Sequence, residues 1–196
     1  NKEVYLVQRT FANNFNDKKY FNLGENKYLS DNNIKNLKKS AVLCLLEPDY
    51  NKGYYNIILT ARSQKLRNHA GQISFPGGRL EKKDRNSYKN CAFREAFEEI
   101  GFNGNKTIFL GKLNKYITGT GYLIQPIIVK GKIKQNFSIN HDEVSSILHL
   151  PINYLLSNNV IKKKFYHKKK SYFYILWRNN RIWGATAKIL IDLINL

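Results

Sequence analysis

The chain of 196 residues has no methionine, two cysteines, four prolines and only 14 acidic residues against 33 basic ones. Cys44 and Cys91 give no disulfide framework and no CxxC metal spacing, so a reducing compartment is expected. No run approaches the roughly 18 apolar residues that a membrane-spanning helix needs. No basic-then-apolar signal segment opens the sequence. These absences predict an intracellular protein, cytoplasmic or organellar, without a membrane partner.

The excess of basic residues gives a formal net charge of +19. Such a charge favours binding to polyanions, among them nucleotides and RNA. Lysine and asparagine recur along the whole chain, however, which is typical of a compositional bias on solvated surfaces. We take this bias as the main source of the charge, so RNA remains a possible but less favoured partner. The lysine runs at 162–164 and 168–170 are interpreted as a solvated hairpin.

Hydrophobic residues make up 42% of the chain and aromatic residues 13%, which is enough for a packed core. Because strand-like and helix-like segments interleave without repeats, we predict one α/β domain over residues 39–196. Residues 1–38 read as a polar N-terminal arm or family-variable extension, ending in a short helix near 31–39. Strands are predicted at 41–46, 54–62, 107–113, 121–130 and 171–178, and helices at 87–100, after Pro151 and at 185–196.

Two smaller expectations concern the loops and the core. Residues 74–84 are predicted to form a loop, because Pro76, Gly77 and Gly78 do not suit a helix interior. Trp177 and Trp183 are expected to lie in the core, with a smaller chance that one of them stacks on an adenine ring.

Three glutamates are packed into five positions of the predicted helix at 87–100, within the stretch REAFEEIGF. Ser87 is a suitable N-cap for this helix and Gly101 a suitable left-handed C-cap. At about 100° per residue, Glu95, Glu98 and Glu99 fall within roughly 100° of one another. Adjacent carboxylates repel, so the cluster predicts a neutralising cation unless it is only a solvated charged face.

The opposite side of the same helix carries Phe93, Phe97 and Ile100, which are predicted to pack on the sheet while the carboxylates point away. Arg94 stands four residues before Glu98 and is close enough in a helix to pair with it. Hard divalent cations such as Mg²⁺ take oxygen ligands, usually carboxylates together with water and substrate phosphate.

At residues 77–102 the pattern of two glycines, a spaced acid and REAFEEIGF resembles the Nudix box, the loop–helix–loop motif of hydrolases that cleave nucleoside diphosphates linked to another group. From Arg94 to Phe102 the match is full, apart from small or aromatic residues in some aliphatic slots. Before Arg94 the chain departs from the pattern. Asp84 replaces the usual glutamate, and nine residues rather than seven separate it from Arg94, so the loop is longer. The role of this first acid is left open.

The stretch ILTARSQKLRNHAGQISFPGG, residues 58–78, resembles the coenzyme A pyrophosphatase subgroup of the Nudix hydrolases. The resemblance extends through about residues 40–196 and implies a Nudix fold, a mixed β-sheet sandwiched between α-helices. Eleven residues match the subgroup extension at fixed spacing: Arg62, Ser63, Leu66, Arg67, His69, Gly71, Gln72, Phe75, Pro76, Gly77 and Gly78.

The resemblance also implies roles. Mg²⁺ or Mn²⁺ would be held by Glu95, Glu98 and Glu99, with Glu95, Glu98, Arg94 and Glu143 as catalytic residues. The substrate would be bound by Arg62, Ser63, Arg67, His69, Gln72, Gly77 and Gly78. Arginine suits phosphate oxygens because its guanidinium binds them in a bidentate way. Each position also fits a structural role; Glu143, for example, could be an acid at the start of a helix.

The implied reaction is hydrolysis of the diphosphate bond of coenzyme A or a derivative, giving 4′-phosphopantetheine and 3′,5′-adenosine bisphosphate. One alternative is a Nudix hydrolase for capped RNA, a dinucleoside polyphosphate or ADP-ribose. Another is a Nudix module that binds nucleotide or RNA without catalysis, although such modules usually lose one of the three helix glutamates.

Overall fold

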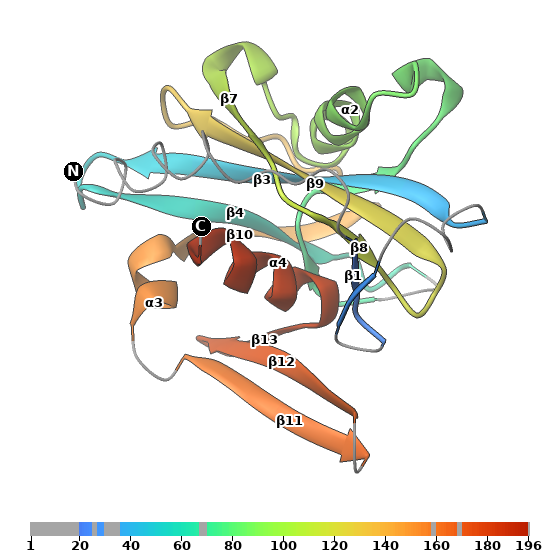
Figure 1. The fold of residues 1–196 in the computed structure, drawn as a ribbon. Coiled ribbons are helices and arrows are strands. Elements are labelled where there is room, and N and C mark those ends of the chain that lie inside the picture. The colour runs from blue at the N-terminus through green and yellow to red at the C-terminus, as the bar shows by residue number, and fades with distance from the viewer. Residues whose placement is uncertain are drawn as a thin grey trace.

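The computed structural model describes residues 20–24, 27–29, 36–66, 70–157, 160–167 and 170–195. Figure 1 shows the layers of the fold: α2 lies above a large sheet, and α3 and α4 lie below it. Within the described residues the elements are β1 (Tyr20–Asn22), β2 (Lys27–Leu29), β3 (Lys38–Asp49), β4 (Tyr54–Arg62), β5 (Ile73–Ser74), β6 (Gly77–Arg79), η2 (Lys82–Asp84), α2 (Tyr88–Ile100), η3 (Gly104–Lys106), β7 (Thr107–Lys112), β8 (Lys115–Ile117), β9 (Tyr122–Gly131), β10 (Val144–Pro151), α3 (Ile152–Leu156), β11 (Ile161–His167), β12 (Lys170–Trp177), β13 (Asn180–Trp183) and α4 (Gly184–Ile194).

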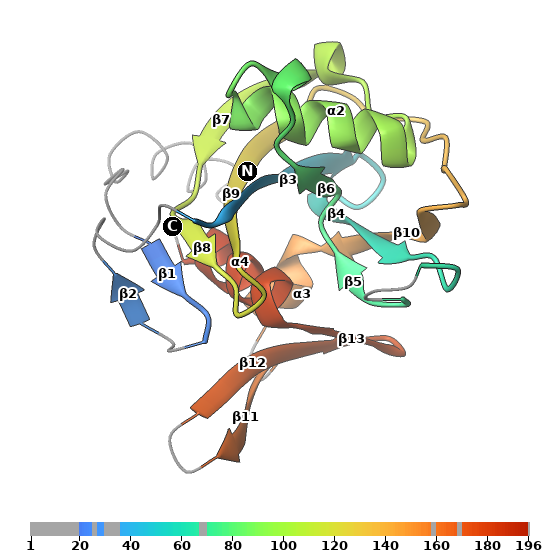
Figure 2. The same cartoon turned by 90° about the vertical axis from the view of Figure 1, so that its right-hand side faces the viewer.

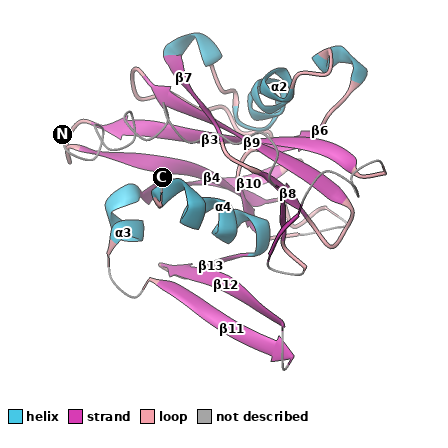
Figure 3. Ribbon diagram, in the orientation of Figure 1, coloured by secondary structure: helices cyan, strands magenta, loops and turns pink. Residues whose placement is uncertain are grey.

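The large sheet is mixed. In the described part of the chain its strands follow the order β10-β4-β3-β9-β8-β1-β2, with β5 on β4, β6 on β3 and β7 on β9. The central pair β3–β9 is parallel, as is β1–β8, whereas β4 is antiparallel to both β3 and β10. A second, antiparallel sheet has the order β11-β12-β13 and lies beyond α4 (Figure 3).

Side chains of β3 alternate between the two faces of the large sheet, as expected for a strand buried on both sides. Leu43 and Leu45 belong to the apolar cluster under α2, together with Ala92 and Ala96 of that helix. Cys44 and Leu46 belong to the opposite cluster, which includes residues of α4 and of β12. Two helical layers therefore cover one sheet, and the predicted α/β class is confirmed.

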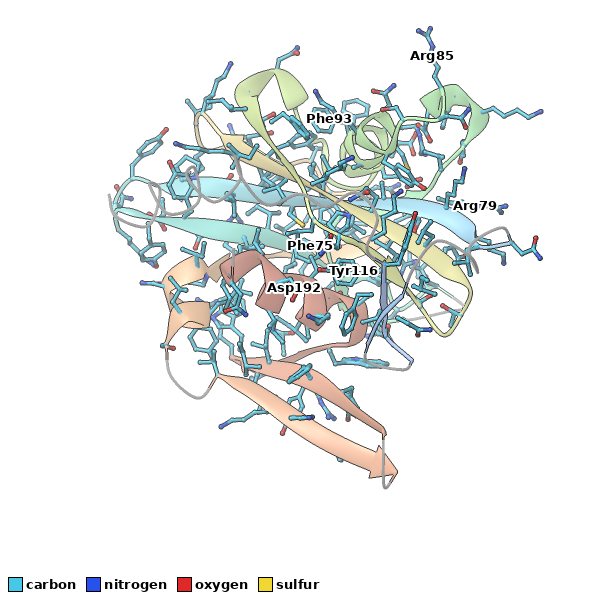
Figure 4. All side chains as sticks on the ribbon, viewed as in Figure 1. Phe75, Arg79, Arg85, Phe93, Tyr116 and Asp192 are labelled. Atoms are coloured by element: carbon cyan, nitrogen blue, oxygen red, sulfur yellow. The ribbon has the colours of Figure 1, made fainter. Side chains whose placement is uncertain are left out.

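Tyr116 of β8 links the sheet to α4 (Figure 4). Its ring is fully buried, and its hydroxyl donates a 2.6 Å hydrogen bond to Oδ2 of Asp192. Asp192 also pairs with Lys188, one turn earlier on α4. Lys188 in turn lies 4.3 Å from the ring centroid of Phe21 on β1. This buried polar group thus joins α4 to β8 and β1.

Some predicted elements need correction. Residues 74–84 are not a continuous loop, because Gly77–Arg79 pairs with β3 as β6 and Lys82–Asp84 forms a 3-10 turn. Lys38 and Lys39 are in β3, so the predicted short helix does not reach them, and residues 31–35 lie outside the described part of the chain. Trp177 is buried, but Trp183 is 45% exposed and is not a core residue. No described helix is both long and apolar enough to cross a membrane.

The N-terminal arm stays a prediction, since its residues 1–19 lie outside the described part of the chain. Within the described part, Tyr20–Asn22 runs parallel to β8 and so joins the large sheet.

Candidate active site

Helix α2 has the caps that the sequence predicts. The Ser87 hydroxyl accepts a 3.2 Å hydrogen bond from the Asn90 amide, and Gly101 adopts a left-handed conformation with φ of 67°. The amide of Gly101 donates to the carbonyl of Phe97 at 2.9 Å. Figure 2 shows α2 lying over β6 and β3, which places its glutamates beside the Gly77–Gly78 segment.

The orientation of α2 about its axis differs from the prediction. Phe97 is 65% exposed, whereas Glu99 is only 4% exposed and lies on the side that packs on the sheet. The buried side consists of small residues, Ala92 and Ala96, with Ile100 at the end. The expectation that Phe97 packs on the sheet while all three carboxylates point away was therefore wrong.

Arg94 is held by an acid from the loop before the helix. Its Nε donates to Oδ1 of Asp84 at 2.8 Å, and its Nη2 donates to Oδ2 at 2.9 Å. Asp84 is itself 2% exposed and also accepts from the Glu81 amide at 2.8 Å. The hydrogen bonds from Arg94 lower the pKa of Asp84, and the same pairing raises the pKa of Arg94. Asp84 therefore fixes the position of the Arg94 guanidinium. The sequence alone did not assign a role to this acid.

Arg94 also contacts two of the three helix glutamates. Its Nη1 lies 2.8 Å from Oε1 of Glu95 and 2.9 Å from Oε2 of Glu98, so the predicted Arg94–Glu98 pair is confirmed. Lys83 donates to the other oxygen of Glu98 at 3.1 Å. Partial burial raises the pKa of Glu98, but the hydrogen bonds from Lys83 and Arg94 together outweigh it and leave that pKa below its ordinary value.

Glu95 lies against the backbone of β6. A Cβ placed on Gly78 would lie 2.3–2.5 Å from the carboxylate atoms of Glu95, so a side chain at this position would displace the carboxylate. Burial is the main cause that raises the pKa of Glu95, and the Arg94 hydrogen bond opposes it. The Gly-Gly segment therefore provides the space that Glu95 occupies.

Glu99 is the most buried of the three acids. Its Oε2 accepts a 3.3 Å hydrogen bond from the Gly77 amide. Burial raises its pKa to about 8, the nearby charges of Glu95 and Glu143 add to the rise, and Arg62 opposes it. Glu95, Glu99 and Glu143 thus form one group of interacting carboxylates that the local cations neutralise only in part.

Glu143 reaches this group from a turn, not from a helix. The described residues His141–Glu143 form a turn that leads into β10, so the helix-start interpretation of Glu143 was wrong. Its carbonyl accepts a 2.9 Å hydrogen bond from the Ser63 amide, and its Oε1 accepts from Asn140 at 3.4 Å. The Asn140 amide donates to the carbonyl of Glu99 at 3.0 Å, which ties this turn to the end of α2.

The predicted substrate residues lie at the end of β4 and in the segment that follows it. The Arg62 amide donates to the carbonyl of Gln72 at 2.9 Å, and Ser63 is buried with its amide bonded to Glu143. Nε of Arg62 is buried and has no hydrogen-bond partner among the described residues. Arg67 and His69 lie outside the described part of the chain. Within the described part of the chain, Arg62 therefore has an unpaired donor, and its charge acts on Glu99.

No three His, Cys, Asp or Glu side chains within the described ranges are placed as a group that could hold a metal ion. A complete protein cage is not what Mg²⁺ requires, however, because it commonly binds through one or two carboxylates together with waters and substrate phosphates. Glu95 and Glu99 offer such carboxylates, and both carry raised pKa values that a cation would offset. The donor set fits a divalent cation, with Glu98 engaged by Arg94 and Lys83.

Comparison with known proteins gives the family of this chain. The NUDIX domain family model matches residues 37–167, and the chain therefore belongs to the Nudix hydrolase family. Within that family it is similar to the protein named "Uncharacterized Nudix hydrolase NudL" of Photorhabdus laumondii, at 34% identity over 175 residues, covering 85% of this chain and 87% of that protein. The protein of the same name from Yersinia pestis (strain Pestoides F) is 32% identical over 168 residues, covering 83% and 79%.

Solved structures show the same fold. A MutT/nudix family protein from Enterococcus faecalis superposes with a TM-score of 0.55 at 13% identity, covering 85% of this chain and 64% of that chain. The predicted Nudix fold is confirmed by this likeness and by the family match.

Proposed function

We propose that this protein hydrolyses the diphosphate bond of coenzyme A or one of its derivatives in the presence of Mg²⁺ or Mn²⁺. The products would be 4′-phosphopantetheine and 3′,5′-adenosine bisphosphate. The substrate class rests on the resemblance of residues 58–78 to the coenzyme A pyrophosphatases. The observation that supports the chemistry is Arg62, whose buried Nε has no partner among the described residues and whose charge acts on Glu99, the acid that also interacts with Glu95 and Glu143.

A diphosphate requires hydrogen-bond donors for its oxygens and a cation to offset its charge. The candidate active site offers residues for both. The Arg62 guanidinium can donate to phosphate oxygens, and such charge-assisted bonds are stronger than neutral ones. Glu95 and Glu99 would hold the divalent cation. When bound, that cation would offset the negative charge of the diphosphate and make the attacking water more acidic. Arg94 and Asp84 keep Glu95 in position through the 2.8 Å contact between Arg94 and Glu95.

Hydrolysis needs a base for one water proton. The water oxygen forms a bond to one phosphorus, the bond from that phosphorus to the bridging oxygen breaks, and the proton goes to a carboxylate oxygen. Glu95 and Glu143 are the two carboxylates proposed for this step, since both interact electrostatically with Glu99. The raised pKa of Glu95 suits proton transfer better than the lowered pKa of Glu98.

Product analysis by mass spectrometry tests the proposal. Purified protein is incubated with coenzyme A, capped RNA and ADP-ribose in parallel, with and without Mg²⁺. We expect metal-dependent release of 4′-phosphopantetheine from coenzyme A, and its loss in Glu99→Gln and Glu98→Gln. Lys112→Gln, a partly buried position on β7, is a control for loss of a side-chain charge. Cleavage of capped RNA or ADP-ribose alone would overturn the substrate class, and no cleavage of any substrate would favour a binding module.

A further inference from the structure

The small sheet β11-β12-β13 presents one face away from the core. Residues that pair across adjacent strands share a face of the sheet. Lys162 and Lys164 of β11 stand opposite Tyr174 and Tyr172 of β12, and Trp183 of β13 also stands opposite Tyr174. We define the outer face as Lys162, Lys164, Tyr172, Tyr174, Leu176, Arg181 and Trp183. Figure 1 shows this sheet below α4, at the edge of the molecule.

The inner face of the small sheet packs against the core. The outer face takes no part in this packing. Ile175, Trp177 and Ile182 are buried in the cluster that includes α4. On the outer face, Leu176 is 48% exposed and Trp183 is 45% exposed. These apolar side chains are therefore not used by the core, and they lie together with lysine and arginine.

Aromatic rings and cations alternate on the outer face. The Arg181 guanidinium lies 4.5 Å from the ring centroid of Tyr174 and 5.5 Å from that of Tyr172. Tyr172 lies 6.2 Å from Trp183 in an edge-to-face arrangement and 6.3 Å from Tyr174. The rings and the guanidinium thus form one continuous surface, with Lys162 and Lys164 along its β11 side.

The segment that forms the small sheet carries charge of one sign. Between Glu143 and Asp192 the sequence has no acidic residue and nine lysines or arginines. A surface evolved only for solubility would be expected to mix both signs. Cations without carboxylates beside exposed rings match the surfaces that bind single-stranded nucleic acid, where bases stack on aromatic or arginine planes and phosphates meet basic side chains.

We propose that the outer face binds single-stranded nucleic acid, as a function separate from hydrolysis. Bases stack on Trp183, Tyr174 and the Arg181 plane, and the phosphates contact Lys162 and Lys164. The small sheet is anchored to the large sheet, because Thr186, just after β13, donates to the carbonyl of Ile73 in β5 at 3.2 Å. Figure 2 shows β13 running beneath β5.

Fluorescence anisotropy with labelled 12-nucleotide single-stranded RNA, single-stranded DNA and duplex DNA tests this proposal. The Lys162→Gln/Lys164→Gln variant is compared with Lys132→Gln/Lys134→Gln, which removes the same charge from exposed positions after β9. At 0.1 M salt we expect the first variant to lose about tenfold in affinity and the second to lose less than twofold. For single strands the slope of log K against log salt should fall by about 1.4 in the first variant, which corresponds to two phosphate contacts.

Stacking is tested separately with Trp183→Leu, which keeps an apolar side chain but removes the ring. We expect a loss of about tenfold in affinity with no change in salt slope, since base stacking on a ring contributes about 1–3 kcal/mol. Circular dichroism melting reports whether each variant is folded, independently of any hydrolysis. The proposal is overturned if no single strand binds, if both lysine pairs weaken binding equally, if duplex binds as well as single strands, or if only phosphatidylserine vesicles bind.

Discussion

Replacing Gly78 with alanine tests whether the Gly-Gly segment positions Glu95. The added Cβ would lie 2.3–2.5 Å from the Glu95 carboxylate, far inside van der Waals contact. The carboxylate therefore has to move by about 1 Å or more, and a displacement of this size in a catalytic group can reduce the rate about 100-fold. We expect kcat/KM for metal-dependent hydrolysis to fall by about two orders of magnitude, which equals about 2.7 kcal/mol of transition-state stabilisation.

The fold should survive this substitution. Inserting a methyl group into a packed site costs about 2 kcal/mol, which in a chain of this length lowers Tm by roughly 4–8 °C. Gly119→Ala is the matched control, because a Cβ there meets nothing within 4 Å. It should leave both kcat/KM and Tm unchanged.

A double variant identifies the cause of the loss. If displacement of Glu95 is the whole effect, Gly78→Ala should have no further effect on activity in a Glu95→Ala background. Steady-state kinetics on the substrate identified by mass spectrometry give the three values needed. An active Gly78→Ala enzyme with kcat/KM within threefold of the unchanged protein would refute the assigned role of Glu95, as would full additivity in the double variant.

Two further predictions concern stability, each measured by thermal melting. Asp84→Asn should destabilise the protein by about 3 kcal/mol, because it removes the charge that neutralises the largely buried Arg94. Since Arg94 lowers the pKa of Asp84, this stabilisation is present above the ordinary value of about 4 and is lost as the pH falls through the lowered value. The difference in Tm from the unchanged protein should therefore be constant between pH 7 and 5 and shrink below pH 4; a difference that grows on acidification would contradict this. Tyr116→Phe should cost about 2 kcal/mol, because Asp192 loses the buried hydroxyl that donates to it; an unchanged Tm would show that Lys188 alone satisfies this carboxylate.

The ends of α2 could be predicted from the sequence, but its rotation could not. Ser87 and Gly101 cap the helix through local hydrogen bonds, and local chemistry can be read from a few residues. The rotation of α2 about its axis depends on which of its side chains fit against the sheet. The small side chains of Ala92 and Ala96 allow α2 to approach β3 closely, and this excludes the larger Phe97 from the interface. Hydrophobicity alone favoured the phenylalanine and gave the wrong face.

The position of Trp183 was mispredicted for a related reason. Tryptophan is apolar enough to be expected inside, yet in a strand the register decides which face a side chain takes. Ile182 is buried against the core, so its neighbour Trp183 has to point outward. β13 itself was not predicted, and without its register the two alternatives could not be separated. Glu143 shows the same limit, because its place in the turn before β10 includes a hydrogen bond from the Ser63 amide, 80 residues earlier in the chain.

Three glutamates of one helical turn occupy three different environments, and the rotation of α2 is the cause. Glu98 faces outward between Arg94 and Lys83, which keep it ionised. Glu95 is partly buried against Gly78, and this burial raises its pKa. Glu99 is buried between α2 and the sheet, where its pKa rises to about 8. If all three side chains had pointed away from the sheet, water would have solvated their charges equally, and none of them would need a cation. Because the small face of α2 turns Glu99 inward, the carboxylate repulsion that local cations do not offset falls on Glu95 and Glu99. A divalent cation would relieve that repulsion, and the phosphate oxygens that come with it could accept from the buried Arg62 donor, which lacks a described partner.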